Sequence, residues 1–518
     1  MAPHKPQLSG LFPSVAVVIN LRRLLSPTVP IPETSPWAVL LLMVLGTTMP
    51  LLDTTIMNVG RYWFVRAFDV TTYETGWLTA GYSLALAMGI PLSHRLRGLF
   101  EEKDLYALST WTFLTGTMIV TSAHTLAEAM IGRAIEGVGG GILLPLSITI
   151  IRETFSPEKI PFALSVFTLA NALAVSLGPT VGGYLIYAWG WQSVFFVNLP
   201  IGFLSIFLSQ IILVNHPRQD PKRFDLWGYL LLCLAAGTFF WGVMAAEWYG
   251  WHSFPIGLAV AVSLITLCLY GLWSALFPEP ILPVELLARP TFLLSLILVF
   301  LVSTSVFGRM YLLAPFLERN YHFQPYQAGE IIAIGAFSEI LTAFLVFSNI
   351  LERIDSRAIL LAACGCLALS NLSYLRLPQN VYSSPMTTIP QVLFGFGLAL
   401  SQFSLGRLIG LSLPQELSRI GGVYQQTVQF LGGMFGTVLS RHLLNNIPPV
   451  YFIAFPQTSA PAAGSVDLQK AASLAYAFGY NMIFEWMGFF PLVAVVLVVG
   501  EWSFRKFFRK TSATPAGG

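Results

Sequence analysis

Residues 37–59 read WAVLLLMVLGTTMPLLDTTIMNV, and Asp53 carries the one charged side chain in this stretch. An α-helix needs about 20 mostly apolar residues to cross the roughly 30 Å hydrocarbon core of a bilayer. The segment is too long for a barrel strand and shows no alternation of apolar and polar residues. Because lipid offers no partner to exposed backbone groups, we expect the segment to cross the membrane as a helix.

Apolar segments of this kind recur along the whole chain. Of its 518 residues, 55% are hydrophobic and 10% are charged, whereas roughly 25% of the residues of an ordinary soluble domain are charged. Length and apolarity predict fourteen spans, near residues 37–59, 74–93, 104–122, 126–151, 160–186, 193–214, 226–246, 255–276, 291–313, 326–346, 357–375, 387–408, 420–440 and 479–500. The sequence therefore predicts an all-α polytopic membrane protein with 14 transmembrane helices.

The lysines and arginines predict the orientation of these helices. With the N-terminus in the cytoplasm, the cytoplasmic segments hold 19 of the 28 basic residues and the external segments hold 6. The other three, Arg133, Arg309 and Arg407, lie within predicted spans. This excess agrees with the positive-inside rule. An even number of spans then places both termini in the cytoplasm.

Two charged stretches that contain proline, residues 215–225 and 277–290, divide the spans. They predict a 6+2+6 arrangement, in which two six-helix halves flank a central cavity and a linker pair is peripheral. The predicted parts are a cytoplasmic N-terminal tail (1–36), an N-terminal half (37–214), a linker with two extra helices (215–276), a C-terminal half (277–500, with a long external loop at 441–478) and a cytoplasmic C-terminal tail (501–518).

The composition argues against several classes of protein. The net charge is only +3, without a lysine- or arginine-rich tract, so no nucleic-acid partner is expected. The four cysteines lie in apolar runs and form no ligand constellation, so we expect packing residues and no metal site. The chain has no Gly-x-x-x-x-Gly-Lys loop, which argues against ATP as the driver. It also shows no pairing of a nucleophile with a base, and we expect neither a cofactor nor enzymatic activity.

Charged side chains inside spans are costly unless they are paired or face water, so they mark candidate sites. Counted at 1.5 Å per residue, Asp53 lies roughly 9 Å below the external end of its span, and Arg133 roughly 10 Å below that of another span. These opposite charges could pair across a cavity. Glu136 follows Arg133 by three residues and shares its helical face. Proton coupling and a static ion-pair cluster both remain open interpretations.

Motifs around these charges resemble those of a known family. They are LDTTIMNV at 52–59, then Trp77, Thr79 and Tyr82, then RAIEGVG at 133–139, GPTVGG at 178–183, and a Trp191-to-Gly202 segment. Their order and spacing resemble the fourteen-helix drug:proton antiporters of the major facilitator superfamily, the EmrB/QacA type, over about residues 35–215. The resemblance implies the major facilitator fold and export driven by a proton gradient. We expect Asn58 and Tyr82, which lie in these motifs, to line a gate or the cavity.

The stretch from Gly178 to Gly183 matches the core of the family's antiporter motif. Gly178, Gly182 and Gly183 allow another helix to approach closely, and Pro179 removes a backbone hydrogen bond and favours a kink. A close-packed, kinked helix between two halves suits a rocking movement. Ordinary small-residue packing is the alternative interpretation of the same pattern.

The chain departs from the family pattern at two places that bear on function. Major facilitators usually carry a Gly-x-x-x-Asp-Arg-x-Gly-type loop between helices 2 and 3, and here residues 94–101 read HRLRGLFE. The loop keeps Arg95 and Arg97 but loses the usual glycine and acidic positions, so latching between the halves must differ. Glu136 stands where the family has glutamine, which adds a second protonatable group.

The C-terminal half contains further candidates. Glu339 lies past the middle of its span, where either a proton relay or cavity role or a pairing within its helix fits. Arg309 and Glu330 both lie near the predicted external side and could pair as a gate. Gln425 and Gln429 give their helix a polar face, which suits cavity lining or hydrogen bonding between helices.

These observations predict a secondary active exporter that takes in protons and releases a hydrophobic or amphipathic molecule, such as a drug. Asp53, Arg133, Glu136 and Glu339 are the expected proton-coupling residues. A dedicated proton-coupled transporter of a natural metabolite, such as a siderophore or lipid, is the alternative, and a sensor or membrane enzyme on the same scaffold is a further one. The resemblance implies a multi-pass protein of the bacterial inner membrane, for which a periplasmic adaptor and an outer-membrane channel are conceivable partners.

Overall fold

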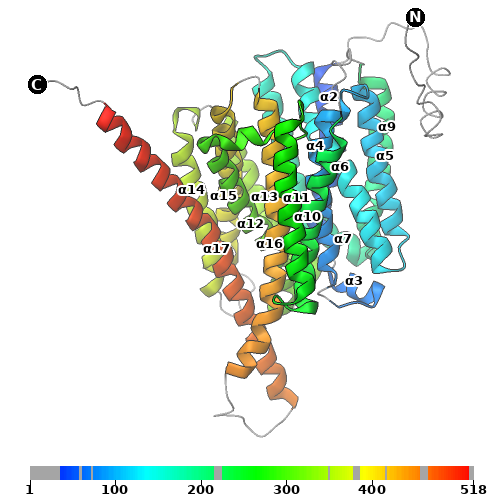
Figure 1. The fold of residues 1–518 in the computed structure, drawn as a ribbon. Coiled ribbons are helices and arrows are strands. Elements are labelled where there is room, and N and C mark those ends of the chain that lie inside the picture. The colour runs from blue at the N-terminus through cyan, green and yellow to red at the C-terminus, as the bar shows by residue number, and fades with distance from the viewer. Residues whose placement is uncertain are drawn as a thin grey trace, which may run out of the picture.

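The computed structural model describes residues 35–57, 61–71, 74–214, 224–321, 323–347, 351–376, 385–414, 417–454 and 465–512, and these residues form helices without any strand (Figure 1). The helices are α2 (Pro36–Ile56), α3 (Arg61–Phe68), α4 (Gly76–Leu96), α5 (Glu102–Thr121), α6 (Leu126–Thr154), α7 (Ile160–Trp189), α8 (Ser193–Phe196), α9 (Asn198–Ile212), α10 (Leu226–Tyr249), α11 (Phe254–Leu276), α12 (Pro290–Asn320), α13 (Pro325–Phe347), α14 (Ser356–Ser373), α15 (Pro385–Ser412), α16 (Ser418–Ala454) and α17 (Ser465–Ser512). Short 3-10 turns occur at Val284–Ala288, Leu351–Arg353 and Tyr374–Arg376.

A helix occupies each segment that the sequence predicted as a span, and α8 and α9 together cover most of the predicted span 193–214, as far as Ile212. Within the described residues, 10 helices are long and apolar enough to cross a membrane, or up to 11 if the bent helix α7 counts as one span. The remaining long helices, α4, α5 and α16, are more polar. α4 and α16 pack against each other in the middle of the bundle, where a helix meets less lipid and tolerates polar side chains.

The long helices stand side by side, and α2 begins at the same end of the bundle at which α17 ends (Figure 1). This arrangement agrees with the even number of crossings that the sequence predicts. The opposite end carries α3, the C-terminal end of α16 and the N-terminal end of α17. By the distribution of basic residues, that opposite end is the predicted external side.

Two pairs of helices join the first part of the bundle to the last part. α7 packs along α13, and α4 packs along α16. Helix α10 lies against the second pair, since the Trp77 ring of α4 meets the Phe240 ring at 5.3 Å and the Trp248 ring at 5.7 Å between centroids. Arg441 of α16 donates to the Met244 carbonyl of α10 at 3.2 Å. The first of the two linker helices therefore contacts both parts at their seam.

Two segments that the sequence placed outside the spans are helical. The predicted external loop at 441–478 is helical at both ends, because α16 continues to Ala454 and α17 already begins at Ser465. The predicted C-terminal tail is likewise helical as far as Ser512. A helix can continue beyond its apolar span, because water forms hydrogen bonds with the exposed backbone of a helix end as it does with that of a coil. Residues 1–34 of the predicted N-terminal tail lie outside the described residues.

Helix α3 was not predicted, because it is short and follows a span without a clear break in composition. Its Phe64 ring packs against Trp191 and Phe195, with centroids 5.4 and 6.3 Å away. Phe68 also contacts Trp191, at 5.3 Å. The Trp191 segment, recognised in the sequence only as a motif, thus fastens α3 across the end of the first helices.

Glycines let α6 approach its neighbours at backbone distance. A Cβ atom added at Gly137 would lie 2.9 Å from the Tyr82 carbonyl oxygen of α4. One added at Gly141 would lie 2.8 Å from the Gly89 Cα and still closer to the Leu86 carbonyl oxygen. Real Cβ atoms do not approach backbone this closely, so α4 and α6 depend on these glycines, as small-residue interfaces in membranes generally do. The close approach brings α6 and its charged residues against α4.

We expect Gly141→Ala to lower the thermal stability of the purified protein, because overpacking against a rigid backbone costs about 1–3 kcal/mol. Gly257→Ala in α11 is the matched control, since nothing lies within 4 Å of a Cβ atom there. There, the better helix propensity of alanine adds up to about 1 kcal/mol. Melting in detergent measures both variants. Equal melting temperatures would contradict the proposed packing of α4 on α6.

Candidate functional site

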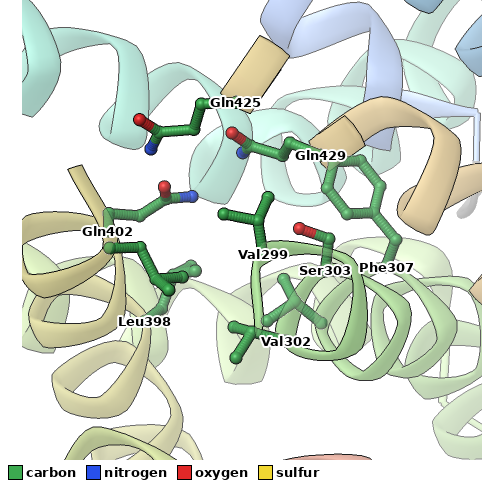
Figure 2. Close-up of a pocket in the computed structure, with 10 residues that line it drawn as sticks. Val299, Val302, Ser303, Phe307, Leu398, Gln402, Gln425 and Gln429 are labelled. Carbon is green, nitrogen blue, oxygen red and sulfur yellow. The ribbon is translucent and has the colours of Figure 1, made fainter. Parts of the chain in front are cut away.

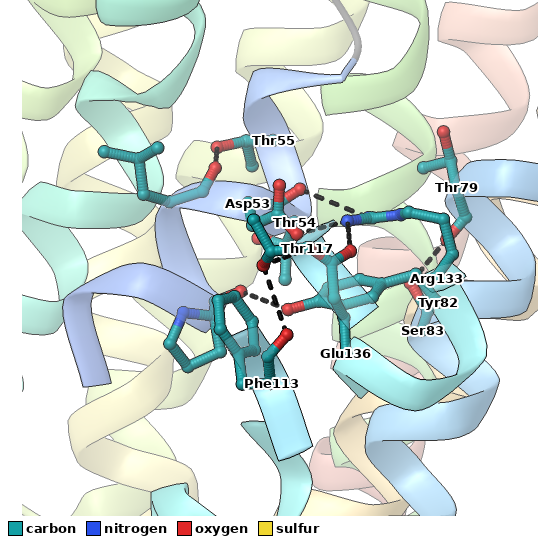
Figure 3. A network of polar contacts seen from close by, with 12 residues as sticks. Asp53, Thr54, Thr55, Thr79, Tyr82, Ser83, Phe113, Thr117, Arg133 and Glu136 are labelled. Carbon is teal, nitrogen blue, oxygen red and sulfur yellow. Dashed lines mark hydrogen bonds and ion pairs between the residues drawn. The ribbon is translucent and has the colours of Figure 1, made fainter. Parts of the chain in front are cut away.

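Arg133, Asp53 and Glu136 form a buried charged cluster between α2 and α6 (Figure 3). The Arg133 guanidinium pairs with the Asp53 carboxylate, and its Nη1 lies 2.8 Å from Glu136 Oε2. The arginine side chain is 1% exposed and both carboxylates are 0% exposed. The predicted pairing of Asp53 with Arg133 across two helices is confirmed. So is the shared face of Arg133 and Glu136.

Neighbouring helices hold the three charged groups in place. Thr117 of α5 donates from its hydroxyl to Glu136 Oε1 at 2.6 Å. The Arg133 guanidinium carbon lies 3.7 Å from the centroid of the Tyr82 ring, a distance that favours cation–π attraction. The Tyr82 hydroxyl in turn donates to the Pro50 carbonyl oxygen at 2.8 Å. The structure places Tyr82 under Arg133 as part of the cluster, and its expected role at a gate or in a cavity stays a prediction.

The cluster is not balanced in charge when all its groups are ionised. Two carboxylates share a single guanidinium, so its net charge is −1. Asp53 Oδ1 is buried and has no hydrogen-bond partner within the described part of the chain. A buried polar atom without a partner is costly, and one extra proton would make the cluster neutral. The geometry therefore offers a place where one proton can bind.

Helix α7 packs its antiporter motif against α2. A Cβ atom at Gly178 would collide with Thr55 Oγ1, and one at Gly182 would lie 2.5 Å from Ile56 Cγ1. Gly183 is also buried. The helix bends by 41° between Val175 and Leu177, one turn before Pro179, where the missing hydrogen bond of a proline acts. The predicted close approach and kink are confirmed.

The same helix closes the bundle toward the predicted external side. Thr180 donates from its hydroxyl to the Gly329 carbonyl oxygen of α13 at 2.6 Å. The Tyr184 hydroxyl donates to Glu330 Oε1 at 2.9 Å. The sequence suggested an Arg309–Glu330 pair here, and that is wrong: Glu330 meets Tyr184 across the seam, whereas Arg309 points deeper into the bundle. A gate role for Glu330 stays a prediction.

Arg309 of α12 is bound by uncharged groups. Its guanidinium donates to Ser370 Oγ of α14, and Nη2 lies 3.2 Å from Gln391 Oε1 of α15. The guanidinium carbon lies 4.0 Å from the centroid of the Phe394 ring. The side chain is fully buried. Within the described residues, no carboxylate lies at salt-bridge distance from it.

Two small cavities lie within the bundle, one at the seam between its parts and one in the second part. One has about 20 Å³ of internal space, enough for about one water. It is lined from both sides of the seam, by Thr55, Val175, Pro179, Arg309, Met310, Leu313, Ile332, Gly335, Ala336, Gln391 and Phe394. The other is lined by α12, α15 and α16, and there Gln425 and Gln429 face Gln402, Ser303 and Phe307 (Figure 2).

Gln425 and Gln429 thus line a cavity wall, which is one of the two roles that the sequence left open. Gln402 was missed, because a single glutamine within an apolar span carries no periodic signal. Glu339 of α13 is buried, at a point where α15 comes so close that a Cβ at Gly395 would lie 2.8 Å from the Glu339 nitrogen. Its expected part in proton coupling stays a prediction. Asn58, expected at a gate, lies outside the described residues.

The altered loop between α4 and α5 carries its own ionic contacts. Arg97 pairs with Glu102 and lies 2.7 Å from Glu153 Oε1 of α6. Arg95 donates to the carbonyl oxygens of Glu279 and Pro280 at 2.7 and 2.5 Å. Arg95 therefore links the loop to the segment that follows the linker helices by donating to backbone carbonyl oxygens. The acidic residue that the family usually has in this loop takes no part in the link.

We expect Arg133→Gln to destabilise the protein by about 3–5 kcal/mol, because it leaves two buried carboxylates without a cation. Adding Asp53→Asn and Glu136→Gln should restore much of the stability. Arg407→Gln, at an arginine that donates to the Leu351 and Ile354 carbonyls, is the control. A triple variant as unstable as the single one would contradict the role of charge in this cluster.

Glu102, ahead of the predicted span 104–122, should make stability depend on pH. Burial and a hydrogen bond shared with Glu153 raise its pKa from 4.5 to about 7, although Arg97 acts in the opposite direction. The folded protein then holds this proton more tightly than the unfolded chain, so stability should fall as pH rises from about 4.5 to about 7. Glu102→Gln should remove that decline from a series of melting curves, whereas Glu158→Gln, at an exposed position, should keep it. A decline that persists unchanged in Glu102→Gln would contradict this assignment.

The fold resembles those of solved transporters. A bacterial homologue of the human lysosomal transporter Spinster, in an inward-facing and unoccupied conformation, aligns with a TM-score of 0.61 at 17% identity, covering 89% of this chain and 96% of that chain. The peptide transporter PepTSo aligns with a TM-score of 0.62 at 12% identity, covering 93% and 99%. At such identities these matches show the fold alone.

Sequence relatives are more informative about the family. The Tetracenomycin C resistance and export protein of Streptomyces glaucescens is 24% identical over 433 residues, which cover 83% of this chain and 80% of that protein. The Multidrug resistance protein B homolog of Mycobacterium tuberculosis (strain H37Rv) is 28% identical over 407 residues, covering 77% and 75%. The model of the Major Facilitator Superfamily matches residues 37–437. This multi-pass helical membrane protein therefore belongs to the Major Facilitator Superfamily.

Proposed function

We propose that the protein is a proton-coupled exporter of hydrophobic or amphipathic small molecules such as drugs. We further infer that it is of the fourteen-helix EmrB/QacA type, with all fourteen long helices crossing the bilayer in a 6+2+6 arrangement. The names of its relatives support export of toxic compounds, since several are named as drug or antibiotic resistance proteins. The helices at all fourteen predicted segments support the number of spans.

One observation supports proton coupling most strongly: two buried carboxylates share one guanidinium. Asp53 and Glu136 both contact Arg133, and all three side chains are buried. In a low-dielectric interior, two like charges this close favour the binding of one proton, which leaves a neutral cluster. If the cluster were only structural, the glutamine that the resembled family has at position 136 would suit it better than Glu136 does. The second carboxylate therefore favours a titrating site.

The position of α2 suggests how proton binding reaches the substrate path. Asp53 faces α6, while Thr55, two residues later, donates to the Val175 carbonyl oxygen of α7 at 2.7 Å and lines the cavity at the seam. A change in the charge of Asp53 alters the force between α2 and α6. That change biases the bent helix α7, which packs on α2 and closes against α13, between the two orientations of the halves.

The energy source, the surroundings and the partners follow from this proposal. A proton gradient drives transport without a cofactor, and the protein lies in the bacterial inner membrane with both termini in the cytoplasm. A periplasmic adaptor and an outer-membrane channel would extend the export path. A dedicated exporter of one natural metabolite is the second candidate. It is favoured by relatives that are each named for a single antibiotic, tetracenomycin C or methylenomycin A.

Transport in inverted membrane vesicles tests proton coupling. An imposed pH gradient should drive uptake of at least one of three fluorescent amphiphiles (a cation such as ethidium, a neutral dye and an anion) by the wild-type protein, and uptake should release part of the gradient. Asp53→Asn and Glu136→Gln should each lower gradient-driven uptake, with Asp53→Asn falling at least tenfold, because a neutral amide cannot carry the proton. Both variants should keep the protein folded, since an amide replaces each carboxylate at the same size.

Glu128→Gln is the matched control for these variants. Glu128 lies on the same helix α6 but is exposed in the capping box with Thr125, where glutamine serves as well. Its uptake should equal that of the wild type. Gradient-driven transport that survives unchanged in the Asp53→Asn, Glu136→Gln double variant would sink the assigned proton site. Wild-type transport that does not change with any imposed pH gradient would contradict proton antiport itself.

A further inference from the structure

Arg309 and Arg133 are two fully buried arginines in very different surroundings. Arg133 has two carboxylates beside it. Arg309 contacts a serine hydroxyl, a glutamine oxygen and the Pro390 carbonyl, the last at 3.5 Å. Since the described residues supply no carboxylate at salt-bridge distance, the positive charge of Arg309 is solvated by neutral groups only. Burying an arginine in this way is expensive, so its place calls for an explanation beyond packing.

The neutral partners hold the guanidinium in one orientation. Ser370 of α14 and Gln391 of α15 each accept from it, and the Phe394 ring lies beneath its plane. Gln391 is itself oriented, because its amide donates to the Tyr374 hydroxyl at 2.8 Å. Arg309 Nε is buried and has no hydrogen-bond partner in the described part of the chain. The Nε–H donor of Arg309 therefore has no acceptor among the described residues, whereas Nη1 and Nη2 donate to Ser370 and Gln391.

The free donor belongs to a side chain that lines the cavity at the seam. Thr55, Val175 and Pro179 form the opposite wall, on α2 and α7, and the remaining lining residues come from α12, α13 and α15. In this closed conformation the cavity has about 20 Å³, which suits one water rather than a substrate. Separation of α7 from α13 would widen it directly, because both helices contribute to its walls. Arg309 therefore places a positive charge on the wall of a cavity that lies between the two parts of the bundle.

We propose that Arg309 binds the anionic group of the substrate, and that the protein accordingly prefers hydrophobic molecules carrying a carboxylate or a comparable oxyanion. This inference rests on the proposed export function and specifies its substrate class. A guanidinium forms strong, directional hydrogen bonds with carboxylates, and desolvation strengthens them. The apolar part of such a molecule would meet Met310, Leu313 and Ile332 on the same walls, and Phe394 beneath the guanidinium. The anion replaces the water that the closed cavity can hold.

A purely structural role makes different predictions. If Arg309 only fastened α12 to α14 and α15, its loss would weaken the binding of every substrate alike and would lower stability. Binding of an anion by Arg309 instead makes the effect of a substitution depend on the charge of the ligand. A set of ligands that differ only in charge separates the two roles.

Three pyrene probes with one fluorophore provide that set: pyrenebutyrate, pyrenebutanol and pyrenebutyltrimethylammonium. Binding to the purified full-length protein in detergent is followed by energy transfer from tryptophan. The wild type should bind pyrenebutyrate at least tenfold more tightly than the other two. Arg309→Gln should abolish this preference while leaving pyrenebutanol binding within about twofold of the wild type. Arg309→Lys, which keeps the charge but loses the planar fork, should retain part of the preference.

Arg407→Gln is the control, because Arg407 is another arginine within a span and does not line the cavity at the seam; it should bind all three probes as the wild type does. If Arg309→Gln does not fold, Arg309→Lys decides, and an undiminished preference in it overturns the proposal. Three other results overturn it: equal binding of the three probes by the wild type, no saturable binding of pyrenebutyrate, or equal weakening of all probes in Arg309→Gln. Proton-driven uptake of any of the three fluorescent amphiphiles by the wild type would leave the proposed export function standing in each of these cases.

Discussion

The cost of burying charge governs this molecule. Every charged side chain within the bundle needs a partner, because the surrounding helices and lipid cannot solvate it. The contact of Arg133 with Asp53 and Glu136 meets this need by joining α2 to α6, and Tyr82 on α4 and Thr117 on α5 complete it. Four helices of the first part of the bundle thus converge on one charged cluster. Their relative positions are set by the same groups that we propose to carry the proton.

The two parts of the bundle bury excess charge of opposite sign. The first part holds an excess of one carboxylate, and the second holds Arg309 without a carboxylate among the described residues around it. Each is an unfavourable arrangement that a small charged species can relieve. A proton relieves the first and an anionic ligand relieves the second. Proteins that retain such costly groups usually use them, and this pair of imbalances defines what the transporter is proposed to bind.

Helix α7 connects these sites to movement. Its glycines let it lie directly on α2, its bend precedes Pro179, and its far end closes on α13 through Thr180 and Tyr184. The contacts between α7 and α13 extend along the seam, and Thr180 and Tyr184 supply hydrogen bonds toward the predicted external side. The Arg95 contacts with Glu279 and Pro280 place a second tie near the linker. That tie uses a different chemistry from the loop motif usual in the family.

The sequence by itself determined the helical membrane class, the position of each long helix and the pairing of Asp53 with Arg133. These follow from length, apolarity and the cost of an isolated charge, all of which are local or nearly so. The tertiary structure decided what each charge meets: Glu330 met Tyr184 rather than Arg309, and Gln402 joined the two predicted glutamines. Such partners depend on how helices distant in the chain are rotated against one another. Within an almost uniformly apolar span, the one-dimensional pattern carries too little amphipathic signal to fix that rotation.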